Sequence, residues 1–176
     1  DEIVLKSVRV KENGTFTQST VTKKEIEKRN LGQDIPILLN YLPSVVSTSD
    51  AGAGIGYTGI RVRGSDATRV NVTINGIPYN DAESQGTFWV NLPDFASSVE
   101  NMQLQRGVGT STNGSGAFGA SLNILTESIA ESASAAINSS FGSYNTFKNN
   151  IKFSTGLLKD HFDLSGRFSL IQSDGY

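Results

Sequence analysis

The chain has 176 residues, a formal net charge of −2 and no cysteine. A chain so close to neutral has no general electrostatic attraction for nucleic acid, and one histidine without cysteine offers little for a zinc site or a histidine-based catalytic triad. We therefore expect no nucleic-acid partner, no metal site and no cofactor. The abundant glycine, serine, threonine and asparagine indicate β structure with many turns.

The N-terminal thirty residues contain a candidate strand and a candidate helix. Asp1–Val10 begins with an apolar run and then alternates, which suits an extended strand that pairs with a sheet edge. Thr22–Asn30 is predicted to be a short surface helix. Thr22 can cap it, Glu25 follows three residues later as a capping-box partner, and Ile26 is its one clear apolar residue.

A second helix is predicted to begin after Asp34, which can cap it, with Pro36 in its first turn. Pro43 ends that helix, and a strand begins at Val45. The next segment, Ser47–Gly59, is rich in serine and glycine and is expected to form a loop.

Two alternating strands are expected next, at Ile60–Gly64 and Val70–Ile74. Asn75-Gly76 favours a type I′ hairpin turn after the second strand. Pro78 then confines the returning strand to a sheet edge, because proline cannot donate a backbone hydrogen bond. The loop Asn80–Asn91 carries the one tryptophan of the chain.

Val99–Arg106 and Ser121–Leu125 are predicted to be strands that flank a glycine-rich segment. That segment also fits the spacing of a dinucleotide-binding fingerprint, at Gly114, Gly116 and Gly119. The fingerprint requires a helix directly after the glycines, whereas a strand is predicted here. The sequence therefore argues against a nucleotide site.

From Ser132 to Tyr176 the chain forms three segments of about ten residues in which apolar and polar side chains alternate. This pattern is typical of transmembrane β-barrels, although a soluble antiparallel sheet would produce the same alternation. Because the chain stops in mid-pattern, we expect it to be a piece of a longer protein. The apolar positions are Ala135, Ile137, Phe141, Ile151, Phe153, Phe162, Leu164, Phe168 and Leu170.

Three blocks carry a family resemblance: IRVRG at Ile60–Gly64, VNVTINGIPYND at Val70–Asp81, and Val99–Thr126. In order and spacing they closely resemble the plug domain of TonB-dependent outer-membrane receptors, over roughly Leu5 to Thr126. The resemblance implies an α+β fold: a plug domain with a small mixed β-sheet and short helices, followed by the first antiparallel strands of a transmembrane β-barrel. The implied domains are a TonB-box-like segment at 1–10, a plug at 11–128 and three barrel strands at 132–176.

The same resemblance implies a receptor and transporter of the cell outer membrane, and not an enzyme. Its plug would occlude its own barrel and help to bind a scarce small molecule or chelate, of the ferric siderophore, haem or cobalamin type, for energised import. The alternative is a non-transport ligand-binding, glycan-binding or signalling β protein of the same membrane. The implied contact with the periplasmic domain of TonB is the N-terminal segment, made up of Asp1, Glu2, Ile3, Val4 and Leu5.

Arg63 and Arg106 each end a predicted strand and are each followed directly by a glycine. By resemblance they are expected to lock the plug to glutamates on the inner barrel wall. Three loops are expected to face the arriving substrate: Thr48–Tyr57, Gly64–Thr68 and Asn80–Val90. Their candidate contacts are Tyr57, Ser65, Asp66, Tyr79, Asp81, Gln85 and Trp89. For Phe88 and Trp89 of the third loop the alternative is packing in the core under Leu92.

Overall fold

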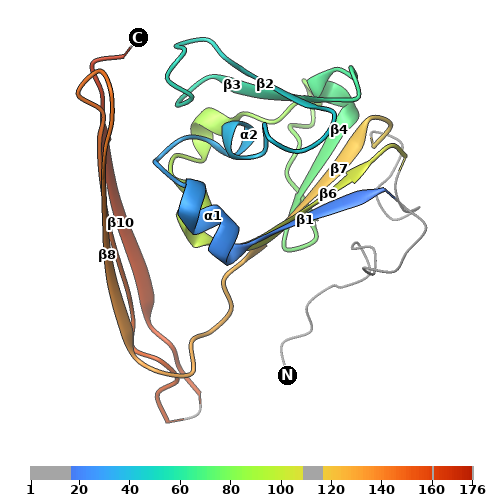
Figure 1. The fold of residues 1–176 in the computed structure, drawn as a ribbon. Coiled ribbons are helices and arrows are strands. Elements are labelled where there is room, and N and C mark those ends of the chain that lie inside the picture. Colours follow the sequence, from blue (N-terminus) through green and yellow to red (C-terminus); the bar gives the residue numbers. More distant parts are fainter. Residues whose placement is uncertain (1–16, 109–116, 160, 176) are drawn as a thin grey trace. The chain divides into compact units, whose positions relative to one another are not determined.

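A computed structural model describes residues 17–108, 117–159 and 161–175 (Figure 1). The chain divides into two compact units, Asp1–Thr126 and Glu127–Tyr176. The expected TonB contact, Asp1–Leu5, and two of the fingerprint glycines, Gly114 and Gly116, lie outside the described residues. None of the helices in the described part of the chain combines the length and the apolar character that a membrane crossing requires.

The first unit is built on a five-stranded mixed sheet with the order β1-β6-β7-β4-β5. Neighbouring strands run antiparallel except β4 and β7, which are parallel. This is the small mixed sheet that the family resemblance implied (Figure 1). Its strands are β1 (Gln18–Thr22), β6 (Val99–Arg106), β7 (Ala120–Thr126), β4 (Val70–Ile74) and β5 (Ile77–Pro78).

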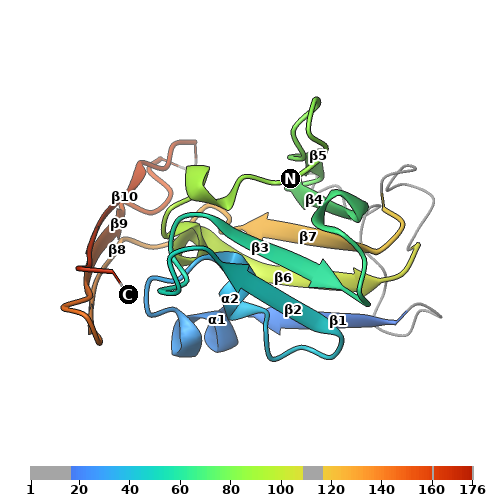
Figure 2. The ribbon, with the colours of Figure 1, turned by 90° about the horizontal axis from the view of Figure 1, so that it is seen from above.

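A hydrophobic core joins this sheet to two helices, α1 (Lys23–Arg29) and α2 (Ile35–Leu38), and to a hairpin of β2 (Val45–Ser49) and β3 (Thr58–Val62). Figure 2 shows the hairpin lying over β6 and β7. The sheet contributes apolar side chains from alternate strand positions to this core, because side chains two residues apart lie on the same face. The fully buried ones include Met102, Leu104, Leu122, Val70 and Val72.

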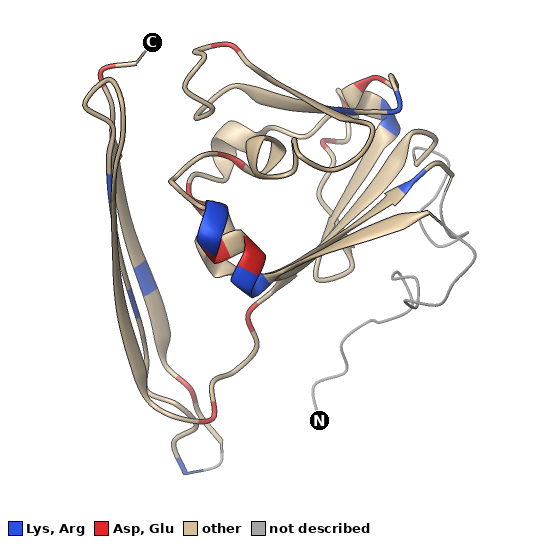
Figure 3. Cartoon of the chain, viewed as in Figure 1, with Lys and Arg blue, Asp and Glu red and all other residues tan. Residues whose placement is uncertain are grey.

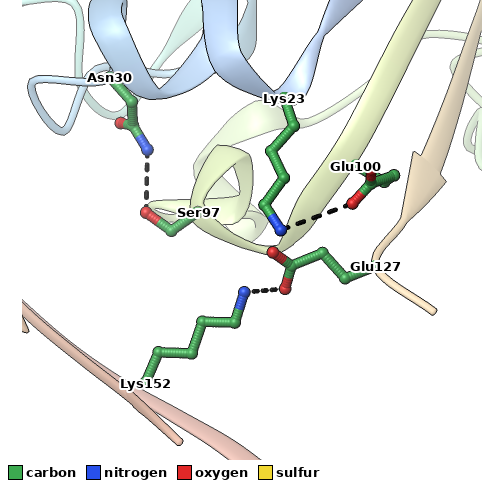
Figure 4. Close-up of polar contacts among 6 residues, drawn as sticks. All are labelled: Lys23, Asn30, Ser97, Glu100, Glu127 and Lys152. Carbon is green, nitrogen blue, oxygen red and sulfur yellow. Dashed lines mark hydrogen bonds and ion pairs between the residues drawn. The ribbon is translucent and has the colours of Figure 1, made fainter. Parts of the chain in front are cut away.

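The structure confirms the capped helix at α1. The Glu25 carboxylate accepts hydrogen bonds from the Thr22 backbone N–H at 2.8 Å and from its hydroxyl at 2.7 Å. Ile26 is buried and anchors the helix in the core. Two polar contacts also join this region to β6 and to the short helix η4 (Phe95–Ser98) (Figure 4): Lys23–Glu100 at 3.6 Å and Asn30–Ser97 at 2.9 Å.

The prediction for the second helix was only partly right. The helix α2 has four residues, and Asp34 precedes it as expected, but the Asp34 side chain makes no capping hydrogen bond. Its carboxylate instead accepts hydrogen bonds from the distant residues Gly56 and Thr58. The long-range contacts are available because β2 and β3 return the chain to the start of α2.

The predicted turns are present. Asn75 and Gly76 have φ values of 52° and 82°, as a type I′ turn requires at its two central positions. Pro78 lies in β5 at the sheet edge, as its missing N–H demanded. Two short 3-10 helices complete the connections, η2 (Ala67–Arg69) and η3 (Trp89–Asn91).

The second face of the five-stranded sheet is polar and also buried, which the sequence did not predict. Gln103 and Asn123 are partners in the register of β6 and β7, and Asn123 is in turn the partner of Thr73 on β4. All three side chains are buried. The Thr73 hydroxyl donates to Asn123 Oδ1 at 2.7 Å. This polar row supplements the backbone hydrogen bonds of the sheet.

The second unit contains three antiparallel strands in the order β10-β9-β8, as predicted. They are β8 (Ser134–Phe141), β9 (Phe147–Ser154) and β10 (Ser165–Gln172). Its register places Ile137, Ile151 and Phe168 side by side on one face. On the other face Asn150 Nδ2 donates to Ser169 Oγ at 2.6 Å. Glu127 at the start of this unit forms an ion pair with Lys152 (Figure 4).

Candidate functional site

A groove of about 230 Å³ opens in the first unit between the start of β3, η2 and the loop Asn80–Val90. Two of the three predicted substrate loops contribute to it, because Thr68 ends the loop Gly64–Thr68 and several lining residues belong to Asn80–Val90. Its lining combines aromatic rings with hydroxyl groups, including Thr58, Thr68, Ser84, Thr87, Phe88 and Trp89.

The two aromatic side chains of this groove are very differently exposed. Trp89 is 2% exposed and belongs to the hydrophobic core, whereas Phe88 is 46% exposed. Trp89 therefore offers a ligand little surface, although it forms part of the groove wall. Phe88 has far more surface available for direct contact than the Trp89 of the sequence prediction.

The loop Asn80–Val90 is shaped by its own polar residues. Asp81 Oδ1 accepts hydrogen bonds from the Ser84 backbone N–H at 2.7 Å and from its hydroxyl at 2.9 Å. These bonds hold the pKa of the Asp81 carboxyl below its usual value. Asn80 Nδ2 donates to the carbonyl oxygen of Val70 at 3.0 Å, which fastens the loop to β4. Gln85 is exposed, with a φ of 59°.

The two predicted substrate contacts of the loop Gly64–Thr68, Ser65 and Asp66, both make contacts within the plug. Asp66 Oδ1 accepts a hydrogen bond from the Thr68 backbone N–H at 2.9 Å, which caps η2 and lowers the pKa of the Asp66 carboxyl. Ser65 lies so close to Gly119 that a Cβ on Gly119 would approach the Ser65 Cβ to 2.5 Å. Glycine at position 119 is therefore required by this close approach.

The loop Thr48–Tyr57 lies at the opposite end of β3 from Gly64–Thr68, because β3 runs from Thr58 to Val62 between them. The three expected substrate loops therefore do not form a single cluster. Tyr57 is 66% exposed and directly precedes Thr58, which lines the groove. The other predicted tyrosine, Tyr79, is partly buried and packs against the core.

The two strand-end arginines lie close together. A Cβ on Gly107 would be 3.2 Å from Arg63 Nη1, so the guanidinium of Arg63 lies against the residue that follows Arg106. Arg106 Nη1 and Nη2 donate to Ser19 Oγ at 2.9 and 2.8 Å. Partial burial and then the nearby charge of Arg63 lower the pKa of Arg106.

Basic residues gather at the edge where β3 and β6 end, beside η2 (Figure 3). The acid of that turn, Asp66, is engaged with Thr68. Within the described part of the chain, no carboxylate forms an ion pair with Arg63 or Arg106. Two neighbouring cations with few neutralising partners repel each other, and a carboxylate-bearing surface would relieve that repulsion.

The described ranges contain no group of three or more histidine, cysteine, aspartate or glutamate residues that could hold a metal ion. The acids of the groove loops are instead bound to nearby backbone N–H groups, as in ordinary turns.

Comparison with known families decides the identity of the first unit. The sequence matches the family described as TonB-dependent Receptor Plug Domain over residues 10–121. The chain belongs to this family. The five-stranded mixed sheet, its two helices and the β2–β3 hairpin are therefore the plug, as the three sequence blocks predicted.

Curated and solved relatives of the plug agree with this assignment. A protein of Acinetobacter baumannii named probable TonB-dependent siderophore receptor PirA is 26% identical, over 63% of this chain and 16% of its own length. The crystal structure of PirA has a TM-score of 0.65 at 23% identity and covers 86% of this chain and 24% of that one. The pyoverdine outer membrane receptor FpvA of Pseudomonas aeruginosa has a TM-score of 0.70 at 14% identity, covering 90% and 22%.

The structural similarity extends past the plug. The outer membrane receptor FauA of Bordetella pertussis, described as the alcaligin receptor, has a TM-score of 0.67 at 21% identity over 89% of this chain and 27% of that one. Because the first unit ends at Thr126 of 176 residues, a match of this extent includes strands of the second unit. The α+β fold with following antiparallel strands is thereby confirmed, and family membership places the protein in the outer membrane.

The chain spans about a quarter or less of the length of these relatives. The sequence indicated the plug blocks, but it assigned no ligand contact to Thr58, Ala67 or Thr87. Those three residues line the groove only because β3, η2 and the loop Asn80–Val90 come together in the fold. Their side chains are common turn and strand residues, and they carry no sequence signal of their own.

Proposed function

We propose that this chain is the plug and the first barrel strands of a receptor that imports a ferric siderophore or a chelate of similar chemistry, without catalysing a reaction. Membership of the plug family supports this proposal, as do the relatives whose names describe siderophore receptors. Import across the outer membrane then requires a barrel, a plug that closes it and a link to TonB.

The observation that carries the substrate assignment is the groove beside Phe88. Its exposed aromatic ring lies among the hydroxyl-bearing residues Thr68, Ser84 and Thr87. Aromatic faces bury large apolar areas, and a few polar groups orient the ligand, so this lining suits a bulky amphiphilic chelate. The groove is smaller than the roughly 300 Å³ or more of a complete small-molecule site. It would therefore hold one part of the ligand, and barrel loops would hold the remainder.

Binding of a ferric siderophore to the full receptor tests this assignment. We expect the combined change of Tyr57, Asp81 and Gln85 to alanine, made together with Phe88→Ala, to weaken binding by roughly tenfold or more. A matched control replaces the exposed residues Glu27, Leu31 and Asn40 by alanine and should leave the dissociation constant unchanged. Equal affinity of both variants would assign the ligand entirely to barrel loops.

We further propose that Arg63 and Arg106 lock the plug to glutamates on the barrel wall. Charge-assisted hydrogen bonds to carboxylates in a partly dry lumen are stronger than surface ion pairs, which contribute about 0–1 kcal/mol. Arg63→Ala with Arg106→Ala should therefore increase ion leakage through the full receptor. Lys24→Ala with Lys28→Ala removes the same charge from the exposed face of α1 and should leave leakage unchanged. Unchanged leakage in both double variants would contradict the proposed lock.

We propose, finally, that Asp1–Leu5 adds as a strand to the periplasmic domain of TonB, since backbone pairing gives affinity with little demand on side chains. Val4→Pro removes one backbone donor and should abolish uptake while substrate binding persists. Normal uptake by this variant would assign the TonB contact to another segment.

A further inference from the structure

Asp34 is a buried carboxylate that contacts a loop more than twenty positions away in the sequence. The residue is 4% exposed. Its Oδ2 atom accepts hydrogen bonds from the Gly56 backbone N–H at 3.0 Å and from the Thr58 hydroxyl at 2.8 Å. Tyr57 stands between these two donors and is 66% exposed. One carboxylate oxygen therefore binds both neighbours of the exposed tyrosine, Gly56 through its backbone and Thr58 through its side chain.

Further contacts fasten the same loop to the start of α2. The Asp34 backbone N–H donates to the Gly54 carbonyl oxygen at 2.9 Å, and Gln33 Nε2 donates to the Ala53 carbonyl oxygen at 3.3 Å. A Cβ on Gly54 would approach Gln33 Nε2 to 2.9 Å and Ile37 Cγ1 to 3.0 Å. The loop thus passes as close to α2 as its backbone permits.

The support beneath this loop is rigid. Three of the four residues of α2 are buried: Pro36, Ile35 at 2% exposure and Leu38 at 5%. Well-packed interiors transmit displacement and do not deform locally, so the position of Asp34 is set by the core. Burial raises the pKa of the Asp34 carboxyl, although the two hydrogen bonds act in the opposite direction. The Asp34 carboxylate is thus buried away from water, where it forms hydrogen bonds with the loop.

We propose that Asp34 is the positioning residue of the substrate site, which holds Tyr57 beside the groove in the orientation that the incoming chelate meets. The inference rests on the proposed function for its ligand. It assigns Asp34 no contact with substrate. Asp34 acts through Gly56 and Thr58, and Thr58 itself lines the groove.

The physical consequence is a lower ordering cost on binding. A loop that already holds its bound conformation loses less conformational entropy when the ligand binds. Each reduction of about 1.4 kcal/mol in this ordering cost increases the affinity tenfold. Without the carboxylate, residues 53–58 lose both hydrogen bonds to Asp34 Oδ2. They keep the bonds to the Asp34 backbone, Gln33 and Ser49, the hydrogen bond from the Asp50 N–H to the Tyr57 carbonyl oxygen, and the pairing of Thr58 with Ser49. We therefore expect Asp34→Ala and Asp34→Asn to weaken binding of a ferric siderophore to the full receptor by about tenfold.

A double-mutant cycle with Tyr57 tests whether Asp34 acts through the tyrosine. In the Tyr57→Ala background, Asp34→Asn should cause a much smaller loss of affinity, because the tyrosine side chain is already absent and only the effect on Thr58 remains. A purely structural role would give the same loss in both backgrounds and would overturn the proposal. Asp50→Asn is the matched control: an exposed acid in the same loop, whose replacement should leave affinity unchanged.

Amide hydrogen exchange of the full receptor without ligand provides an independent measurement. The Gly56 N–H donates a hydrogen bond to Asp34 Oδ2. Its hydrogen should exchange about tenfold faster in Asp34→Asn than in wild type or in Asp50→Asn. Unchanged exchange at Gly56 would overturn the proposal. If wild-type receptor binds no ferric siderophore while Gly56 still responds to Asp34→Asn, the proposed substrate is wrong and the loop-holding role of Asp34 stands.

Discussion

The two sheets of this chain follow the same alternation of apolar and polar residues but expose opposite faces. In the plug sheet the apolar residues are inside, and Met102 and Leu122 have no exposed surface. In the three-stranded sheet of the second unit the apolar residues are outside: Ile137 is 74% exposed and Phe168 69%. The polar residue Asn150, which directly precedes Ile151 on β9, is buried.

This difference shows that alternation fixes which residues share a face, but not which solvent that face meets. In water an exposed apolar face of this kind is a liability. In a bilayer it is the expected outer surface of a barrel, whose strands alternate apolar-out and polar-in. The plug packs its apolar residues inside, as a domain surrounded by water does, and the following strands present theirs outward, within one chain of 176 residues.

The largest expected effect comes from the plug core. Leu122→Ala should lower the free energy of unfolding of the plug by about 2–5 kcal/mol, because it removes buried methyl groups and leaves a cavity. Denaturant unfolding of the chain in mild detergent, followed by the fluorescence of its one tryptophan, Trp89, measures this. Ile137→Ala is the comparison in the second unit and should leave the transition unchanged. A similar shift for both would contradict the opposite exposure of the two sheets.

On the apolar face of the second unit, a charged substitution should impair membrane insertion, whereas truncation to alanine should have little effect. Ile137→Arg should reduce insertion of the full receptor into bilayers, with a cost of up to about 4 kcal/mol near the membrane midplane. Asn138→Arg places the same charge one residue along β8, on the other face of the strand. Folding yield in vesicles compares them, and equal yields would show that neither face meets lipid.

The polar second face of the plug sheet predicts a smaller effect. Thr73→Val removes the hydrogen bond to Asn123 Oδ1 and leaves a buried acceptor unpaired, at a cost of about 1–3 kcal/mol. Thr20→Val changes an exposed threonine of β1 and should cost less. The same tryptophan-monitored unfolding measures both variants. If the two lose equal stability, the Thr73–Asn123 bond contributes nothing.

The smallest expected effect is a pH dependence of plug stability. Burial raises the pKa of Asp34 above its ordinary value of 3.8. The folded plug then holds the proton more tightly than the unfolded chain, so Asp34's contribution to stability falls as the pH rises from 3.8 through the raised pKa and is constant above it. Asp66 has a lowered pKa, so its contribution is lost as the pH falls. Asp34→Asn should therefore remove a falling slope in that window, and Asp66→Asn a rising one. Slopes of the same sign would contradict the burial of Asp34.

Local interactions were predictable because the residues that make them are neighbours in the sequence. The pairing of Thr22 with Glu25 in the capped helix, the Asn75-Gly76 turn and the edge position of Pro78 each depend on four residues or fewer. Alternation indicated most of the strands of both units, but it missed β1, and β2 and β3 extend into the segment Ser47–Gly59 that was expected to be a loop. The plug blocks and the strand-end arginines followed from motif order and spacing.

The tertiary structure decided everything that depends on distant partners. Asp34 had the sequence features of a helix cap, but the returning β2–β3 hairpin supplies donors at Gly56 and Thr58 that its carboxylate binds instead. For Trp89 the sequence left open a substrate contact or a place in the core, and the fold decides for the core, where η3 lies against β3. A carboxylate or an indole has the same local preferences in either setting. Only the arrangement of chain segments far apart in sequence determines which partner, and which solvent, each side chain meets.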